Sequence, residues 1–224
     1  MKRIAALILA LLCLLPMQAK AAAPMGLTVP AAVLMEKTTG TILYEENATV
    51  PYEPASVTKI MTLLLVMEAI DSGALGWEDT VTASTHAISM GGSQIWLKEH
   101  EQMTVRDMVK AVAVVSANDC SVALAEHVAG SCEKFAVRMN ERAAELGMEH
   151  SSFANPNGLD DERHYSTARD MARLACAAMK DPTLMRIASS RSVTIGGRTM
   201  TNHNKLLSMM EGCIGLKTGY TRAA

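Results

Sequence analysis

The sequence predicts an α/β (α+β) fold in which a group of helices is inserted between strands near the two ends of the chain. Paired β-prone runs occur early, at 32–44, and late, at 192–200, and the residues between them show helical spacing of apolar side chains. The chain has 224 residues, of which 49% are hydrophobic and 20% are charged. This length and composition suit one domain with a sizeable core and exclude a disordered or fibrous chain.

The first 21 residues are predicted to be a signal peptide. Lys2 and Arg3 provide a positive start, 4–15 is an apolar run, and Ala19-Lys20-Ala21 fits a cleavage site. An uncleaved membrane anchor is the alternative, but the apolar run is short for a span. We therefore expect residues 22–224 to form an exported domain in the cell envelope, either periplasmic or on the outer face of the cytoplasmic membrane.

Each predicted element has its own signal in the sequence. The apolar runs of 32–44 flank a turn and predict a hairpin, and Gly196-Gly197 predicts a second hairpin within 192–200. The segment 56–70 is apolar on nearly all sides, which is typical of a buried central helix. Further helices, separated by a polar loop at 151–165, are predicted at 104–115, 122–128, 135–146 and 168–179.

Charge balance and residue spacing argue against several classes of function. The chain has 21 Lys and Arg against 23 Asp and Glu, so no basic excess indicates nucleic-acid binding. The six histidines form no H-E-x-x-H motif, which disfavours a zinc peptidase. Four cysteines follow the leader at wide spacings that predict no metal site and assign no disulfide pairing: Cys120, Cys132, Cys176 and Cys213.

Ser56 and Lys59 are the first candidate catalytic pair. They lie three residues apart at the start of the buried helix, so their side chains share one face. Burial of an ammonium group is costly, and we expect the pKa of Lys59 to fall until it can accept a proton from Ser56. A capping serine beside a lysine that reaches solvent is the alternative, and this motif alone does not decide between the two.

The triplet Ser116-Ala117-Asn118 is the second candidate. It follows an apolar run directly, so its polar side chains should emerge at the rim of the core. Ser116 could relay a proton, and the Asn118 amide could both donate to and accept from a peptide bond. Ordinary helix caps are the alternative.

The third candidate is Lys217-Thr218-Gly219, followed by Tyr220, in a segment that we expect to be a strand. Glycine in a strand permits close approach of a ligand backbone, and Lys217 with Thr218 suits a carboxylate. A phosphate-binding loop is excluded because Glu211 stands where that motif requires glycine.

The order of these three motifs is more informative than any one of them. S-x-x-K, then S-x-N, then K-T-G is the motif set of penicillin-binding proteins and serine β-lactamases. From residue 28 or so to its end, the chain resembles the D-alanyl-D-alanine carboxypeptidases, which are low-molecular-mass penicillin-binding proteins. The resemblance also extends to the segments 55–62, 92–97, 155–160, 164–171 and 202–207.

The resemblance implies a fold and a reaction. The implied fold is that of the DD-peptidases and β-lactamases, an antiparallel sheet flanked by a helical subdomain. Ser56 would attack the bond between two terminal D-alanines of a peptidoglycan stem peptide, and Lys59 would take its proton. Backbone N–H groups of Ser56 and Tyr220 would hold the oxyanion, and water would hydrolyse the acyl-enzyme.

The resemblance also implies how substrate would bind. Ser116 would pass a proton to the leaving amine, and Asn118 would orient the substrate amide. The segment from Lys217 through Thr218 and Gly219 to Tyr220 would bind the terminal carboxylate and line the site. β-Lactam antibiotics would acylate the nucleophile, and no metal, organic cofactor or nucleic acid is implied.

In this family the K-T-G strand joins the sheet through two later strands, which are followed by a β-rich domain and an amphipathic membrane anchor. Because the sequence stops at Ala224, we expect a C-terminally truncated sheet. We also expect a destabilised product with little activity. Membrane association would then depend on an anchor that this chain lacks.

Two alternative functions stay open. A serine β-lactamase shares all three motifs, although no acidic residue occurs in an E-x-x-L-N setting. A non-catalytic wall-binding homologue would keep the fold, although all the motif residues are intact. The sequence does not distinguish hydrolysis from transpeptidation.

Overall fold

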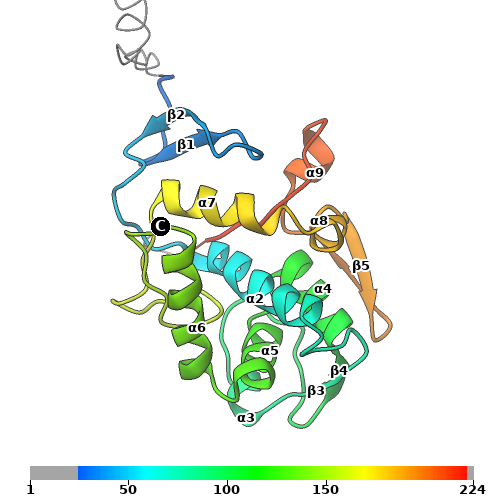
Figure 1. Cartoon of the computed structure of the whole chain (residues 1–224). Helices are drawn as coiled ribbons and strands as arrows, with labels where there is room; N and C mark the ends of the chain where they lie inside the picture. Colours follow the sequence, from blue (N-terminus) through cyan, green and yellow to red (C-terminus); the bar gives the residue numbers. More distant parts are fainter. Residues whose placement is uncertain (1–24, 221–224) are drawn as a thin grey trace, which may run out of the picture.

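The computed structural model describes residues 25–220, which form a helical region with small antiparallel sheets around it (Figure 1). The proposed signal peptide, residues 1–21, lies outside the described residues. The sheets pair β1 (Ala32–Met35) with β2 (Ile42–Glu46), β3 (Thr80–Thr82) with β4 (Gln102–Thr104), and β5 (Ser192–Ile195) with β6 (Arg198–Thr201). The helices are η1 (Ala55–Thr58), α2 (Lys59–Asp71), α3 (Thr85–Ile88), α4 (Val105–Val115), α5 (Asn118–Ala129), α6 (Cys132–Glu145), α7 (Ala168–Ala178), α8 (Pro182–Ala188) and α9 (Leu206–Met209).

Helix α2 is the centre of the core. It contacts α7 on one side and α4 and α5 on the other (Figure 1). Met61 and Val66 are fully buried, and the polar Lys59 and Thr62 are buried with them. A helix enclosed on all sides can be apolar all round, as the sequence predicts, and its first turn is thereby held in a fixed place.

Hydrogen-bonding side chains fix where the outer helices begin. Thr104 accepts from the Asp107 N–H at 3.2 Å and starts α4. Thr167 accepts from the Asp170 N–H at 3.1 Å and starts α7. These starts confirm the helices predicted at 104–115 and 168–179. Such caps stabilise a helix end because they satisfy N–H groups that have no partner within the helix.

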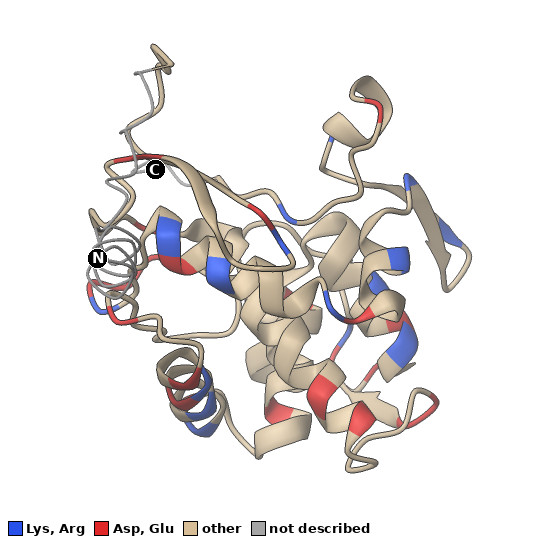
Figure 2. Ribbon diagram, turned by 45° about the horizontal axis from the view of Figure 1, so that its top comes forward, with Lys and Arg blue, Asp and Glu red and all other residues tan. Residues whose placement is uncertain are grey.

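Helix α6 lies at the edge of the helical region and carries acidic and basic residues along its length (Figure 2). Arg142 of α6 donates to Glu68 of α2 at 2.9 Å and to Glu145 at 2.7 Å. These partly exposed ion pairs contribute little stability, and Phe135 and Met139, which are fully buried, hold α6 to the core. Within residues 25–220, no helix combines the length and apolar character needed to cross a bilayer.

The predicted strand at 214–220 is wrong for the described residues. The segment forms no strand and pairs with none, because a strand requires a neighbour for its ladder of hydrogen bonds and β5 and β6 pair only with each other. Helix α5 begins at Asn118, earlier than the predicted start at 122. All four cysteines in the described part of the chain are free thiols: Cys120, Cys132, Cys176 and Cys213.

Candidate active site

Ser56 and Lys59 lie where the short helix η1 passes into α2. Lys59 is fully buried, and its Nζ lies 2.9 Å from the Ser56 Oγ. The same Nζ donates to the Asn157 carbonyl oxygen at 2.5 Å. Of the two sequence interpretations, the structure rejects a lysine that reaches solvent, because the amine is enclosed and held beside the serine hydroxyl.

Burial lowers the pKa of Lys59 well below its ordinary value of 10.5, and the positive charge of Lys217 lowers it further. Within residues 25–220, Lys59 forms no ion pair that would oppose this shift. The uncharged amine can donate one N–H to Asn157 and turn its lone pair to the Ser56 hydroxyl. The geometry therefore allows Lys59 to act as a general base for Ser56.

Ser116 and Asn118 lie at the junction of α4 and α5. Ser116 ends α4 in a left-handed conformation with φ +63°, which is uncommon for a residue with a side chain. The Asn118 Nδ2 donates to the Gly91 carbonyl at 2.6 Å. The Ser116 Oγ and the Asn118 Oδ1 are buried and make no hydrogen bond to any described residue. Buried polar atoms nearly always have partners, so these two atoms are suited to a bound molecule.

The three motifs meet at one cleft of about 990 Å³. The first motif contributes Ser56, the second contributes Ser116 and Asn118, and the third contributes Thr218, Gly219 and Tyr220. The rest of the lining is Gly92, Ser93, Gly158, Leu159, Asp160 and His203. The structure thus brings together side chains that lie up to 164 positions apart in the sequence, between Ser56 and Tyr220.

Lys217 stands beside this cleft and is half-buried. Its Nζ donates to the Thr218 carbonyl at 2.7 Å, and burial lowers its pKa to about 8. Below that pH the ammonium is charged and can attract a carboxylate. The positive charge of Lys217 near neutral pH also helps to lower the pKa of Lys59.

Gly219 lines the cleft and also packs closely against the turn that carries Ser56. A Cβ at Gly219 would lie 2.9 Å from the Val57 Cγ2 and 3.1 Å from the Pro54 carbonyl oxygen. The missing side chain therefore lets the K-T-G segment rest on the turn that carries Ser56. This contact with the chain's own turn adds a structural role to the predicted approach of a ligand backbone, which stays a prediction.

The loop after α6 contains residues that hold the turn of the nucleophile in place, and the three motifs did not identify these residues. At Gly158, with φ +81°, a Cβ would lie only 1.9 Å from the Ala55 carbonyl oxygen, so only glycine fits. His164 lies 2.7 Å from the Thr58 Oγ1 and accepts from the Ala154 N–H through Nδ1 at 3.0 Å. Both segments, 155–160 and 164–171, belong to the family resemblance, but the resemblance did not indicate that they hold η1 in place.

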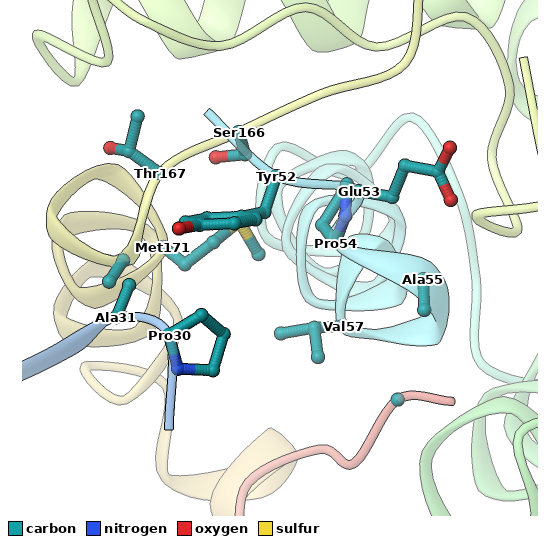
Figure 3. A pocket seen from close by; sticks show the side chains of 12 residues that line it. Pro30, Ala31, Tyr52, Glu53, Pro54, Ala55, Val57, Ser166, Thr167 and Met171 are labelled. Carbon is teal, nitrogen blue, oxygen red and sulfur yellow. The ribbon is translucent and has the colours of Figure 1, made fainter. Parts of the chain in front are cut away.

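A second hollow of about 560 Å³ is lined by Ala55 and Val57 of η1 and shares Gly219 with the cleft. Figure 3 shows Pro30, Tyr52, Val57 and Met171 around it. Its walls are mostly apolar and contain no nucleophile beside a base. The candidate reaction site is therefore the cleft at Ser56.

The fold is that of the penicillin-binding proteins, as comparison with known structures shows. Residues 17–224 match the family model described as D-alanyl-D-alanine carboxypeptidase. The D-alanyl-D-alanine carboxypeptidase DacF of Bacillus subtilis is 45% identical over 199 residues, which are 87% of this chain and 51% of that protein. The chain belongs to the D-alanyl-D-alanine carboxypeptidase family.

Solved structures agree with the assignment and confirm the predicted fold class. The D-alanyl-D-alanine carboxypeptidase DacD from Francisella tularensis matches with a TM-score of 0.85 at 30% identity, over 93% of this chain and 64% of that one. A penicillin-binding protein from Listeria monocytogenes, solved in its ampicillin-bound form, matches with a TM-score of 0.82 at 30% identity, over 91% and 83%. The chain spans about half the length of the curated relatives it matches.

Proposed function

We propose that this chain carries the catalytic site of a serine-type D-Ala-D-Ala carboxypeptidase that trims the terminal D-alanine from peptidoglycan stem peptides. The observation that best supports this function is the 2.9 Å contact between the Ser56 Oγ and the buried Lys59 Nζ. This pair lies at a cleft that residues of the other two motifs also line. An export signal at 1–21 would place the enzyme outside the cytoplasm, where its substrate is.

In the proposed reaction, the Ser56 Oγ attacks the carbonyl carbon of the D-Ala-D-Ala bond while its proton passes to the Lys59 Nζ. The carbonyl oxygen becomes an oxyanion, for which the N–H groups of Ser56 and Tyr220 are the proposed donors. The C–N bond then breaks, and the leaving amine takes a proton through Ser116. Water attacks the resulting ester and releases the shortened peptide with free Ser56.

The remaining residues position the substrate. The unpartnered Asn118 Oδ1 is suited to accept the N–H of a substrate peptide bond. Lys217 and Thr218 would bind the terminal carboxylate, and Gly219 and Tyr220 would flank it. β-Lactams present a carboxylate and a strained amide in a similar arrangement, so they are expected to acylate Ser56.

The test is the mass of the intact protein after brief exposure to benzylpenicillin, together with release of D-alanine from a peptide ending in D-Ala-D-Ala. The proposed mechanism predicts a stable adduct of the antibiotic's mass and release of D-alanine, both lost in Ser56→Ala, and these results would overturn the low activity expected for a truncated sheet. Rapid turnover of penicillin without a lasting adduct would indicate a β-lactamase. Binding of peptidoglycan with neither adduct nor release would indicate a non-catalytic homologue.

A further inference from the structure

A cluster of three potential metal ligands lies outside the cleft, at the end of the helical region where α3 meets α5 and α6 (Figure 1). His86 comes from α3, Glu126 from α5 and Cys132 from the first turn of α6. One ligand atom of each lies within 4.8 Å of the other two. In the part of the chain that the structure describes, this is the single group of three or more such side chains that meets this spacing.

The donor set has the chemistry of a zinc site. Imidazole nitrogen, carboxylate oxygen and thiolate sulfur are the three kinds of protein ligand that Zn²⁺ takes, and three protein ligands leave a fourth position for water. A carboxylate and a thiolate together carry two negative charges, which balance one Zn²⁺. When the ion binds, the Cys132 S–H bond breaks, a Zn–S bond forms and the proton leaves to solvent.

The surroundings hold the carboxylate in place. The Glu126 Oε2 accepts from the Ser84 Oγ at 2.6 Å, and this hydroxyl also accepts from the Ala87 N–H at 2.9 Å, which caps α3. The other oxygen, Oε1, lies 2.7 Å from the His86 Nδ1. Ser84 therefore ties the carboxylate to the helix that carries His86, as outer partners of metal ligands commonly do.

Access and space also suit an ion. The His86 side chain is 52% exposed, so it is open to solvent on one side, whereas Cys132 is buried. Tetrahedral zinc with bonds of about 2.0–2.1 Å would hold the nitrogen and oxygen ligands roughly 3.3 Å apart. The His86–Glu126 contact would thus open by roughly half an ångström, which an exposed histidine side chain can accommodate.

We propose that His86, Glu126 and Cys132 form a zinc-binding site that links α3, α5 and α6. The cysteine and histidine spacings of the sequence predict no metal site, but these three ligands come from three separate elements. The site is independent of the proposed function. An ion there would join the far end of α5, which begins at Asn118 in the cleft, to the two neighbouring helices.

The first experiment uses the untagged, metal-free chain titrated with Co²⁺ and then Zn²⁺. We expect one equivalent of Co²⁺ to give a thiolate-to-cobalt charge-transfer absorption that Zn²⁺ abolishes. Cys132→Ser should lose this absorption, and the matched control Cys176→Ser should keep it. No absorption in the unmodified chain, or its survival in Cys132→Ser, would overturn the proposal.

A second pair of variants avoids the buried cysteine, whose replacement could disturb folding. His86→Ala removes an exposed side chain, and His127→Ala removes an exposed histidine one position beyond Glu126. In calorimetric titration with Zn²⁺, we expect His86→Ala to weaken Kd by more than ~100-fold, because even outer partners are worth about 10–100-fold. His127→Ala should bind as the unmodified chain does. Equal affinity in the two variants would refute the site.

Discussion

At the scale of single residues, the site depends on one buried amine. Lys59, at the start of α2, is fully buried, contacts Ser56 and Asn157, and has a pKa well below 10.5 because of that burial. If it is the general base, Lys59→Met should lower the rate constant of penicillin acylation about 10²–10⁴-fold, the usual contribution of a positioned base. Stopped-flow or quenched mass measurements of adduct formation would give this rate.

The matched control is Lys205→Met, which removes an exposed lysine outside the cleft lining. It should acylate at the rate of the unmodified chain. Circular dichroism of Lys59→Met must match as well, so that lost chemistry is separated from lost folding. Normal acylation by folded Lys59→Met would show that another group takes the Ser56 proton.

Lys217 makes a pH-dependent prediction. Its pKa is lowered to about 8 by burial, so the ammonium is charged below pH 8 and neutral above it. Binding of a carboxylate substrate should therefore weaken as pH rises through about 8, seen as a rising KM for a D-Ala-D-Ala peptide. Lys217→Arg keeps its charge at high pH, so its KM should stay flat between pH 7 and 9.5. Parallel pH profiles for the two proteins would contradict a carboxylate-binding role.

Asp119 is a buried residue that holds the segment 95–97 in place, just after the cleft-lining residues Gly92 and Ser93. Its carboxylate is fully buried and accepts from the Ile95 N–H at 3.2 Å and the Leu97 N–H at 3.1 Å. Trp96 between them has φ +63° and is 73% exposed. Asp119→Ala would leave two buried N–H groups unpartnered, so the free energy of unfolding should fall by about 2–5 kcal/mol. Urea unfolding measures this loss, and Glu141→Ala, an exposed acidic change on α6, should stay within about 0.5 kcal/mol.

At the scale of elements, the sequence predicts long helices well because periodicity and caps act locally. Thr104 and Thr167 set the starts of α4 and α7, and each accepts a hydrogen bond from an N–H group only three residues further along the chain. The four-residue helices α3 and α9, and the three-residue strands β3 and β4, give no comparable signal and were not predicted. They are too short for a period to show and are held by tertiary contacts.

The same division applies to the site. The types and order of the motif residues can be read from the sequence, and the lowered pKa of Lys59 follows from its position in a helix that the sequence predicts to be buried. The support from Asn157 and the close approach of Gly158 to Ala55 join segments about a hundred positions apart. Such contacts depend on the whole fold, so spacing along the chain cannot predict them.

Helix α7 provides the prediction at this scale. It packs on α2, and its start depends on the buried Thr167, whose Oγ1 accepts from the Asp170 N–H. Thr167→Ala should lower the free energy of unfolding by about 0.5–2 kcal/mol, the usual effect of losing a cap. Thr167→Ser keeps the hydroxyl and should lose less than Thr167→Ala in urea unfolding. Equal losses would mean that the methyl group, and not the cap, stabilises this position.

At the scale of the whole molecule, buried polar contacts join the nucleophile turn to the loop of 151–167. Thr62 and Ser121 both donate to the Pro156 carbonyl, at 2.6 and 2.8 Å, and so connect α2 and α5 to this loop. His164 joins the same loop to Thr58 of η1. Since its Nδ1 accepts from the Ala154 N–H, the neutral ring must carry its proton on Nε2 and donate to the Thr58 Oγ1.

Protonation of His164 therefore opposes folding. Burial lowers its pKa from 6.5 to about 4, so the unfolded chain binds a proton at a higher pH than the folded chain does. Stability from this group is fully present above pH 6.5 and is lost as pH falls toward 4, by up to roughly 3 kcal/mol. The pKa of His203 is also lowered by burial, and it acts in the same direction. Urea unfolding at intervals from pH 7.5 to 4.5 should show this decline.

The decline with pH can be assigned to His164 by replacing it with a side chain that does not titrate. His164→Gln should be less stable at pH 7.5, because it loses the paired ring, but its stability should fall less steeply between pH 6.5 and 4.5. His150→Gln, at an exposed position, should keep the original slope. The half-buried Glu36 and Asp161 have pKa values lowered from 4.5 and 3.8 to about 2, so the stability that these two groups contribute is lost mainly below pH 4.5, under this window. If the free energy of unfolding of His164→Gln fell with pH as steeply as that of the unmodified chain, other groups would make the fold sensitive to acid. Protonation of His164 would then not be what weakens the contact between the loop and η1.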